Sequence, residues 1–158
     1  MSLEFRYAKR DDTELILSFI KNLAEYEKMS DDVVADTATL EKEIFDDKKA
    51  EVLFAEVDGK EIGFALFFHN FSTFVGRSGL YLEDIYILPE YRGKGYGKAM
   101  LKKLASIAAA RNCGRMEWCC LDWNKPGIDF YLSLGAKPMS EWTIYRLSGD
   151  ELKNFGEG

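Results

Sequence analysis

The stretch from Leu80 to Arg111 constrains the fold more than any other part of this 158-residue sequence. Its first residues, Leu80 to Leu88, are mostly apolar and are typical of a buried strand. The run Arg92-Gly93-Lys94-Gly95-Tyr96-Gly97 follows, and a helical pattern then continues to Arg111. Glycine lets the backbone approach a ligand closely, and the first N–H groups of a helix have no partner inside the helix. The sequence therefore predicts a site for an anionic phosphate group where this helix begins.

The spacing of these glycines indicates which kind of phosphate loop this is. A dinucleotide-binding loop requires a third glycine where Lys98 stands, and a Walker A loop requires Ser or Thr where Ala99 stands. The sequence instead fits the pattern Arg/Gln-x-x-Gly-x-Gly/Ala. It resembles the pyrophosphate-binding loop of the GNAT family of acyl-CoA-dependent N-acetyltransferases. A flexible turn that caps a helix is the alternative, which the position between a strand and a helix disfavours.

Composition excludes several classes of protein. With 47% hydrophobic residues the chain can bury the core of one domain over residues 1–158, and no apolar run of about 18 residues is present to span a membrane. Three cysteines without a Cys-x-x-Cys pair and a single histidine, His69, predict no metal site. A pI of about 4.9 argues against a nucleic-acid partner. Because the N-terminus lacks the apolar segment of a signal peptide, we expect a cytoplasmic protein.

Opposite charges gather in two separate blocks. Residues 25–47 contain nine acidic residues against two lysines, whereas residues 91–116 contain seven basic residues and no acidic one. The basic block includes the predicted phosphate loop and suits an anionic cofactor, and the acidic block would suit a cationic co-substrate. Solvated helix faces are the ordinary alternative for such blocks.

Apolar periodicity predicts an α/β fold, with a central mixed sheet and helices on both of its faces. Strands are predicted at residues 3–7, 51–57, 61–70, 80–88, 116–121, 136–139 and 142–147, and helices from residue 11 or 12 to about 29, at 39–47, from the glycine loop to 111, and at 127–134. Strands joined by a crossover helix should be parallel and adjacent. The turns at 92–97 and 122–125 should then share one edge of the sheet, where α/β folds bind ligands.

Acetyl transfer to an amine requires a base, because an alkylamine titrates near pH 10.4 and is almost wholly protonated at pH 7. Glu83 and Asp84 interrupt the otherwise apolar strand, and the period of two predicts that they point to opposite faces. An unpaired carboxylate is costly inside a sheet, so at least one should face a ligand, water or a cation. We assign Glu83 as the general base, acting directly or through a water. For Asp84, a salt bridge to a neighbouring helix is as good an interpretation as a role in the site.

The thiolate that leaves in such a reaction is helped by a proton. Tyr131 is the candidate donor, because the pKa of a phenol, about 10, and that of a thiol, about 8.5, are close enough for the transfer. A core aromatic is the default interpretation of this tyrosine. Backbone N–H groups near Tyr86 and Ile87 would polarise the thioester carbonyl if the strand bulges or splays there.

Further motifs extend the resemblance over nearly the whole chain, towards the diamine acetyltransferases, which include the spermidine/spermine and thialysine N-acetyltransferases. These motifs are Tyr26-Glu27, Leu80 to Tyr86, Tyr91 to Gly97, Trp123 to Pro126, Phe130-Tyr131 and Gly135-Ala136. The resemblance implies a homodimer with a small cationic amine as substrate. The resemblance also implies an acetyl-CoA site formed by Ile85, Tyr86, Ile87, Arg92, Gly93, Lys94, Gly95, Tyr96, Gly97 and Lys98. By the same resemblance, the pantetheine arm is held by Asn124, Lys125, Pro126 and Gly127, and its sulfur is protected or protonated by Tyr131. The resemblance further implies that the amine is bound by Tyr26, Glu27, Glu83, Glu117, Trp118 and Cys119.

The predicted function is therefore transfer of the acetyl group of acetyl-CoA to a primary amine by direct attack, without a metal, with Glu83 as base and Tyr131 as acid. The run Leu121 to Asn124 is nearer to the thialysine-type members, so a lysine-like or short diamine acceptor stands slightly ahead of spermidine. Two alternatives stay open. One is a protein lysine or N-terminal acetyltransferase, and the other is a non-catalytic acyl-CoA-binding module that regulates a partner.

Overall fold

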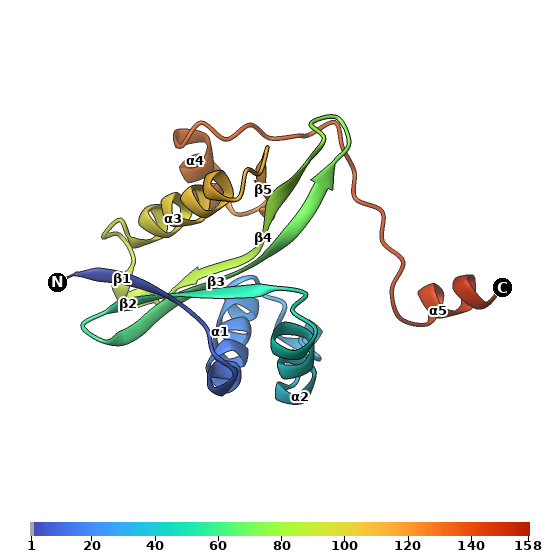
Figure 1. The fold of residues 1–158 in the computed structure, drawn as a ribbon, viewed down its shortest axis with the longest axis horizontal. Helices are drawn as coiled ribbons and strands as arrows, with labels where there is room; N and C mark the ends of the chain where they lie inside the picture. Colours follow the sequence, from blue (N-terminus) through green and yellow to red (C-terminus); the bar gives the residue numbers. More distant parts are fainter. Residues whose placement is uncertain (1) are drawn as a thin grey trace. The chain divides into compact units, whose positions relative to one another are not determined.

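Two compact units make up the chain in the computed structural model, which describes residues 2–158 (Figure 1). We call residues 2–119 the sheet unit and Cys120–Gly158 the C-terminal unit. The sheet unit contains β1 (Leu3–Tyr7), α1 (Thr13–Tyr26), α2 (Thr37–Leu40) with a π-helical continuation (Glu41–Asp46), β2 (Glu51–Val57), β3 (Lys60–Ser72), β4 (Arg77–Ile87), α3 (Tyr96–Ala110) and β5 (Met116–Trp118). The C-terminal unit contains α4 (Lys125–Ser133) and α5 (Gly149–Glu157).

The strands of the sheet unit form one mixed sheet in the order β1-β2-β3-β4-β5. Neighbours from β1 to β4 are antiparallel, whereas β5 pairs with β4 in parallel, as predicted for strands on either side of a crossover helix. The β2–β3 turn at Asp58-Gly59 has positive φ at both residues, 52° and 78°, which is the geometry expected of a two-residue hairpin with this sequence.

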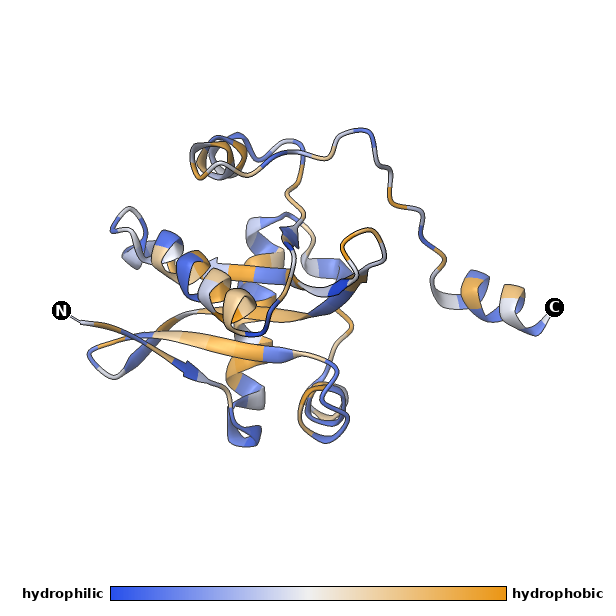
Figure 2. Cartoon of the chain, turned by 45° about the horizontal axis from the view of Figure 1, so that its top comes forward, coloured by the Kyte–Doolittle hydropathy of each residue, from blue (hydrophilic) through white to orange (hydrophobic). Residues whose placement is uncertain are grey.

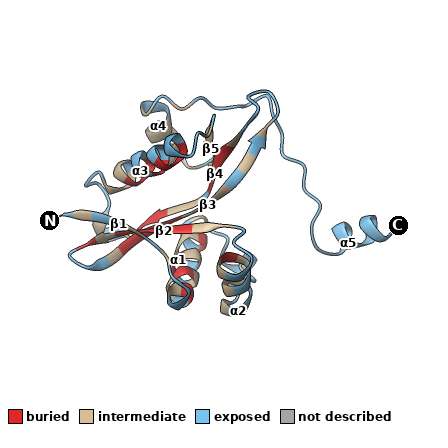
Figure 3. Cartoon of the chain, in the orientation of Figure 1, coloured by how far each residue is buried: buried red, intermediate tan, exposed pale blue. Residues whose placement is uncertain are grey.

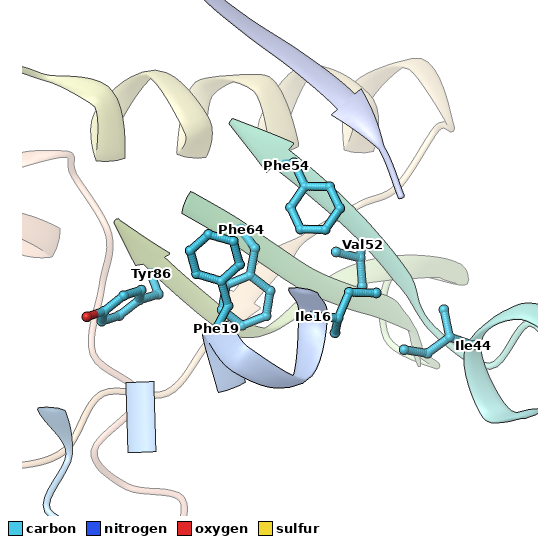
Figure 4. Close-up of a cluster of buried hydrophobic side chains, with 7 residues drawn as sticks. All are labelled: Ile16, Phe19, Ile44, Val52, Phe54, Phe64 and Tyr86. Atoms are coloured by element: carbon cyan, nitrogen blue, oxygen red, sulfur yellow. The ribbon is translucent and has the colours of Figure 1, made fainter. Parts of the chain in front are cut away.

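Helices cover both faces of this sheet, as the sequence predicted (Figure 1). On one face, Phe19 of α1 stacks on Phe64 of β3 with ring centroids 5.4 Å apart, within a buried cluster that also includes Phe54 and Tyr86 (Figure 4). On the other face, α3 buries a stripe consisting of Met100, Leu101, Leu104, Ile107 and Ala108 (Figure 3). The central strands are hydrophobic over most of their length (Figure 2), as expected where helices cover both of their faces.

The C-terminal unit differs from the prediction. Residues 136–139 and 142–147 form no strands, and α5 lies beyond the last element predicted from the sequence. Pro138 removes a backbone donor from the first segment, and a strand is stable only when it pairs. Neither segment pairs with another strand anywhere in residues 2–158. The strand predicted at 116–121 is also shorter, because it ends at Trp118.

Within the described residues, no helix is long and apolar enough to cross a membrane.

Candidate active site

A β-bulge interrupts β4 at Glu83. Leu82 pairs with Phe67 and Asp84 pairs with Leu66, so Glu83 is the extra residue between two consecutive pairs. Because neighbouring residues of β3 point to opposite faces, their partners Leu82 and Asp84 do so as well, although they are two positions apart. The period of two, from which Glu83 and Asp84 were predicted to point to opposite faces, therefore does not hold across this bulge. Asp84 lies on the face that α1 covers, together with Tyr86.

The two parallel strands separate immediately before this bulge. β5 pairs with β4 only from Leu80 to Leu82, so the last five residues of β4 have no strand partner on that side in the described structure. Around Tyr86 and Ile87 the pairing with β3 is regular, so the bulge lies earlier than these residues. Because β5 diverges from β4, residues 83–87 of β4 have no neighbouring strand on the side of β5 among the described residues. Backbone N–H groups directed to this edge are suited to an oxygen ligand.

Three carboxylates, those of Glu27, Glu83 and Asp84, gather where α1 ends beside the bulge. Burial raises the pKa of Glu27, and the negative charge of Glu83 raises it further. Burial also raises the pKa of Asp84, to about 7, and the charges of Glu83 and Glu27 act in the same direction. No cationic side chain opposes these effects on Asp84, so the salt bridge considered for it does not form in the described structure. A cationic ligand bound beside these carboxylates would stabilise their charged forms and lower their pKa values again.

The glycine loop lies between the short turn Pro89–Tyr91 and α3. Gly93 and Gly95 have φ of 76° and 84°, a conformation in which a side chain would be strained. The first backbone hydrogen bond of α3 runs from the N–H of Ala99 to the carbonyl of Gly95. The N–H groups of Tyr96 to Lys98 come before this bond, so they have no acceptor within the helix. Exposed Lys94 and Lys98 add positive charge. The loop therefore fits the diphosphate of a coenzyme at the start of a long helix.

Arg92 makes contacts that the motif alone does not predict. Its Nε donates to the Ile87 carbonyl at 2.8 Å, and its backbone N–H donates to the Pro89 carbonyl at 3.2 Å. The guanidinium carbon lies 5.2 Å from the ring centroid of Tyr26 and 5.0 Å from that of Tyr86. The side chain thus joins the end of α1 to the end of β4.

Strand β5 places Glu117 and Trp118 beside residues 81 and 82 of β4, and Cys119 follows directly after this strand. Glu117 pairs with Tyr81 across the parallel ladder and accepts a hydrogen bond from Asn70 Nδ2 at 3.4 Å. Tyr81 Oη lies 3.0 Å from Cys119 Sγ. This contact, burial and the charges of Glu83 and Glu117 all raise the pKa of Tyr81. Sequence reasoning missed Tyr81, and the available signal was its position two residues before Glu83 in the central strand.

The remaining predicted residues belong to the C-terminal unit. Asn124 is the N-cap of α4, where its side-chain oxygen accepts the N–H of Gly127 at 3.2 Å. Lys125, Pro126 and Gly127 form the first turn, and the ring centroid of Tyr131 lies 5.6 Å from that of Phe130 further along α4. The structure therefore brings the predicted residues together as two groups, one within each unit.

Comparison with known proteins identifies the family. The sequence model of the Acetyltransferase (GNAT) family matches residues 17–136 of this chain, which includes the carboxylates, the glycine loop and Tyr131. The chain belongs to this family. It is an N-acetyltransferase, and the family uses acetyl-CoA, as the glycine loop indicated.

Relatives of known name narrow the branch within the GNAT family. The chain is 38% identical to a thialysine N-epsilon-acetyltransferase of Sus scrofa, over 98% of this chain and 97% of that protein. It is 34% identical to spermidine/spermine N(1)-acetyltransferase-like protein 1 of Homo sapiens, over 94% of this chain but only 23% of that protein. Among solved structures, a Vibrio cholerae integron cassette protein superposes with a TM-score of 0.82 at 28% identity, over 100% of this chain and 99% of that one. The GNAT-like fold and the resemblance to this branch are therefore confirmed.

No group of three or more His, Cys, Asp or Glu side chains in residues 2–158 is arranged to hold a metal ion. The glycine loop instead offers backbone N–H groups and lysines, which suit the phosphates of a coenzyme.

Proposed function

We propose that this N-acetyltransferase transfers the acetyl group of acetyl-CoA to a primary amine of a small cationic acceptor, either lysine-like or a short diamine. The observation that carries the proposal is that the carboxylates of Glu27, Glu83 and Asp84 lie close together. At Asp84, no cationic side chain in residues 2–158 balances the negative charge of this group. An ammonium group supplies the missing positive charge. The relatives named as thialysine and spermidine/spermine acetyltransferases support an acceptor of this class.

In the reaction the acceptor nitrogen loses two protons, one from the ammonium before attack and one from the tetrahedral intermediate, and the sulfur gains one. The neutral amine nitrogen attacks the thioester carbonyl carbon, an amide bond forms, and the carbon–sulfur bond breaks to leave the coenzyme thiolate. Glu83, which is exposed at the bulge, takes the proton of the ammonium, directly or through a water. Tyr131 gives a proton to the departing sulfur and recovers one from solvent, and solvent takes up the second proton that the nitrogen loses as the intermediate collapses. The splayed edge of β4 provides backbone N–H groups for the carbonyl oxygen as it gains charge.

Acetylation of a panel of amines tests this proposal directly. The panel contains lysine, thialysine, short diamines, spermidine, and peptides with a lysine or a free N-terminus, and release of free thiol from acetyl-CoA is followed. We expect the highest kcat/KM for a lysine-like amine or a short diamine. A preference for peptides would instead establish a protein acetyltransferase. Normal acetyl-CoA binding in calorimetry with no turnover on any amine would establish a regulatory acyl-CoA-binding module.

A further inference from the structure

We propose that Arg92 is a positioning residue that couples the glycine loop to the acceptor carboxylates, and that its side chain is not a ligand of the coenzyme phosphates. This inference rests on the proposed function, because it concerns how the two halves of that site communicate. The motif gives Arg92 as the first residue of a phosphate loop, which makes a phosphate contact the obvious role for its charge. The contacts of the side chain indicate otherwise.

The donors of Arg92 that lie nearest to the backbone are already used inside the protein. Its N–H closes the turn to Pro89, and Nε donates to Ile87, the last residue of β4. Its guanidinium lies over the rings of Tyr26 and Tyr86, at 5.2 and 5.0 Å. A planar guanidinium can stack on aromatic rings while it donates a hydrogen bond in its own plane, which a lysine ammonium cannot do. The side chain is therefore held by a carbonyl and two aromatic rings.

The residues that Arg92 joins come from both halves of the proposed site. Tyr26 is the last residue of α1, and Glu27 of the carboxylate group follows it directly. Tyr86 lies two positions after Asp84, on the same face of β4. Gly93, the residue after Arg92, begins the left-handed part of the glycine loop. A change in the loop on coenzyme binding is thus transmitted through one side chain to the segment that holds the acceptor carboxylates.

Other groups can serve the phosphates, although Arg92 is itself exposed and Lys94 also lies over an aromatic ring, that of Tyr91 at 5.5 Å. Lys94 and Lys98 are exposed in the loop and in the first turn of α3, and the N–H groups of Tyr96 to Lys98 lie at the same helix end. These groups supply charge and hydrogen bonds without Arg92. Loss of the Arg92 contacts should therefore affect the acceptor more than the coenzyme.

Hydrogen exchange with free coenzyme A as the probe tests the coupling without any turnover. In the wild type, saturating coenzyme A should slow exchange of the amides of residues 26–29, of which Glu27, Lys28 and Met29 donate to carbonyls of α1. Arg92→Lys keeps the charge but removes the stacking geometry, and it should lose most of this protection. Arg111→Lys is the matched control, because Arg111 also lies over an aromatic ring, that of Phe67 at 5.8 Å, but follows the opposite end of α3. This control should retain the protection.

Steady-state kinetics provide the second readout. In Arg92→Lys the KM for the amine should rise about tenfold, while the dissociation constant of coenzyme A changes less than threefold. A Tyr26→Leu variant should have a similar effect, and the double variant should be no worse than the poorer single one, since both remove the same contact.

Three results would overturn the proposal. In the first, coenzyme A does not slow exchange of residues 26–29 in the wild type. In the second, this slowing persists in Arg92→Lys. In the third, Arg92→Lys binds the coenzyme about tenfold more weakly while its KM for the amine is unchanged. The last result would make Arg92 a phosphate ligand after all. A wild type that binds coenzyme A but acetylates no amine would refute the proposed function while leaving the exchange result readable, so the two failures can be distinguished.

Discussion

The sheet unit and the C-terminal unit use their apolar residues in opposite ways. In the sheet unit, aromatic side chains such as Phe54 and Phe64 are 0% exposed between the strands and α1. In the C-terminal unit no residue is buried, and Trp142 and Tyr145 are 75% and 92% exposed (Figure 3). The carboxylates proposed to bind the acceptor and the glycine loop thus lie on a packed scaffold, whereas the proposed acid lies on a helix without a core of its own. Packing fixes geometry, so the predicted residues of the sheet unit and those of the C-terminal unit should respond differently to substitution.

The largest effect is expected from the core of the sheet unit. Phe64→Ala removes a ring that stacks on Phe19 and leaves a cavity beneath α1, which should lower the free energy of unfolding by about 3–5 kcal/mol. Urea unfolding followed by circular dichroism measures this change. A loss below about 1 kcal/mol would mean that this aromatic cluster is not what stabilises the sheet unit.

The second prediction concerns the base on this scaffold. Glu83→Gln should lower turnover by about 10²–10⁴-fold at pH 7, the range typical of general base catalysis. The loss should shrink as the pH rises towards 9, because more of the acceptor amine is then neutral without help. The measurement is kcat against pH for both proteins, with Glu14→Gln, an exposed position in the first turn of α1, as the matched control. A loss that stays constant with pH would leave Glu83 as a binding residue only.

The contrast between the units also explains which features the sequence could predict. The glycine loop and the Asp58-Gly59 turn were predictable because their conformation depends on a few adjacent residues. The crossover from β4 through α3 to β5 followed from the apolar pattern and the handedness of such connections. The groups proposed to bind the phosphates are local in the same sense.

The bulge at Glu83 was not predictable in this way. It exists because β3 and β4 shift register between Leu66 and Phe67, and a single strand read alone does not reveal its register. The carboxylate of Glu27 joins Glu83 and Asp84 only through the packing of α1 on the sheet. The prediction of a strand at residues 142–147 was wrong for a related reason, because alternating apolar residues form a strand only beside a partner strand.

The third prediction uses the pKa of Asp84. Burial and the two neighbouring carboxylates raise this pKa to about 7 in the folded protein, against an ordinary value near 3.8. Between pH 4 and 7 the folded state therefore retains a proton that the unfolded chain releases, so stability falls as the pH rises through this window. Because one pKa unit corresponds to about 1.4 kcal/mol, the fall should amount to a few kcal/mol.

Asp84→Asn removes this contribution and provides the measurement. From pH 4.5 to pH 8, the free energy of unfolding of the variant should rise relative to that of the wild type. Above about pH 8 the difference between the two proteins should be constant. Parallel pH profiles for the two proteins would show that Asp84 titrates normally and that the carboxylate group is not desolvated.

The fourth prediction moves to the C-terminal unit. Tyr131→Phe removes the proposed proton donor but keeps the ring beside Phe130, and turnover should fall about a hundredfold, the low end for acid catalysis. Acetyl-CoA binding in calorimetry should change much less than kcat. Unchanged kinetics would remove Tyr131 from the acid role. In contrast with Glu83→Gln, the loss should not diminish as the acceptor amine becomes neutral.

The smallest effect is expected furthest along the same unit. Tyr145→Ala truncates a large side chain that is 92% exposed, and it should change the free energy of unfolding by less than about 0.5 kcal/mol. The measurement is the same urea titration used for Phe64→Ala, so the two aromatic truncations differ only in burial. If Tyr145→Ala instead costs more than 1 kcal/mol, and more so at high protein concentration, then Tyr145 is covered by a second copy of the chain in solution. The contrast between a packed and an unpacked unit would then describe the isolated chain but not the assembled enzyme.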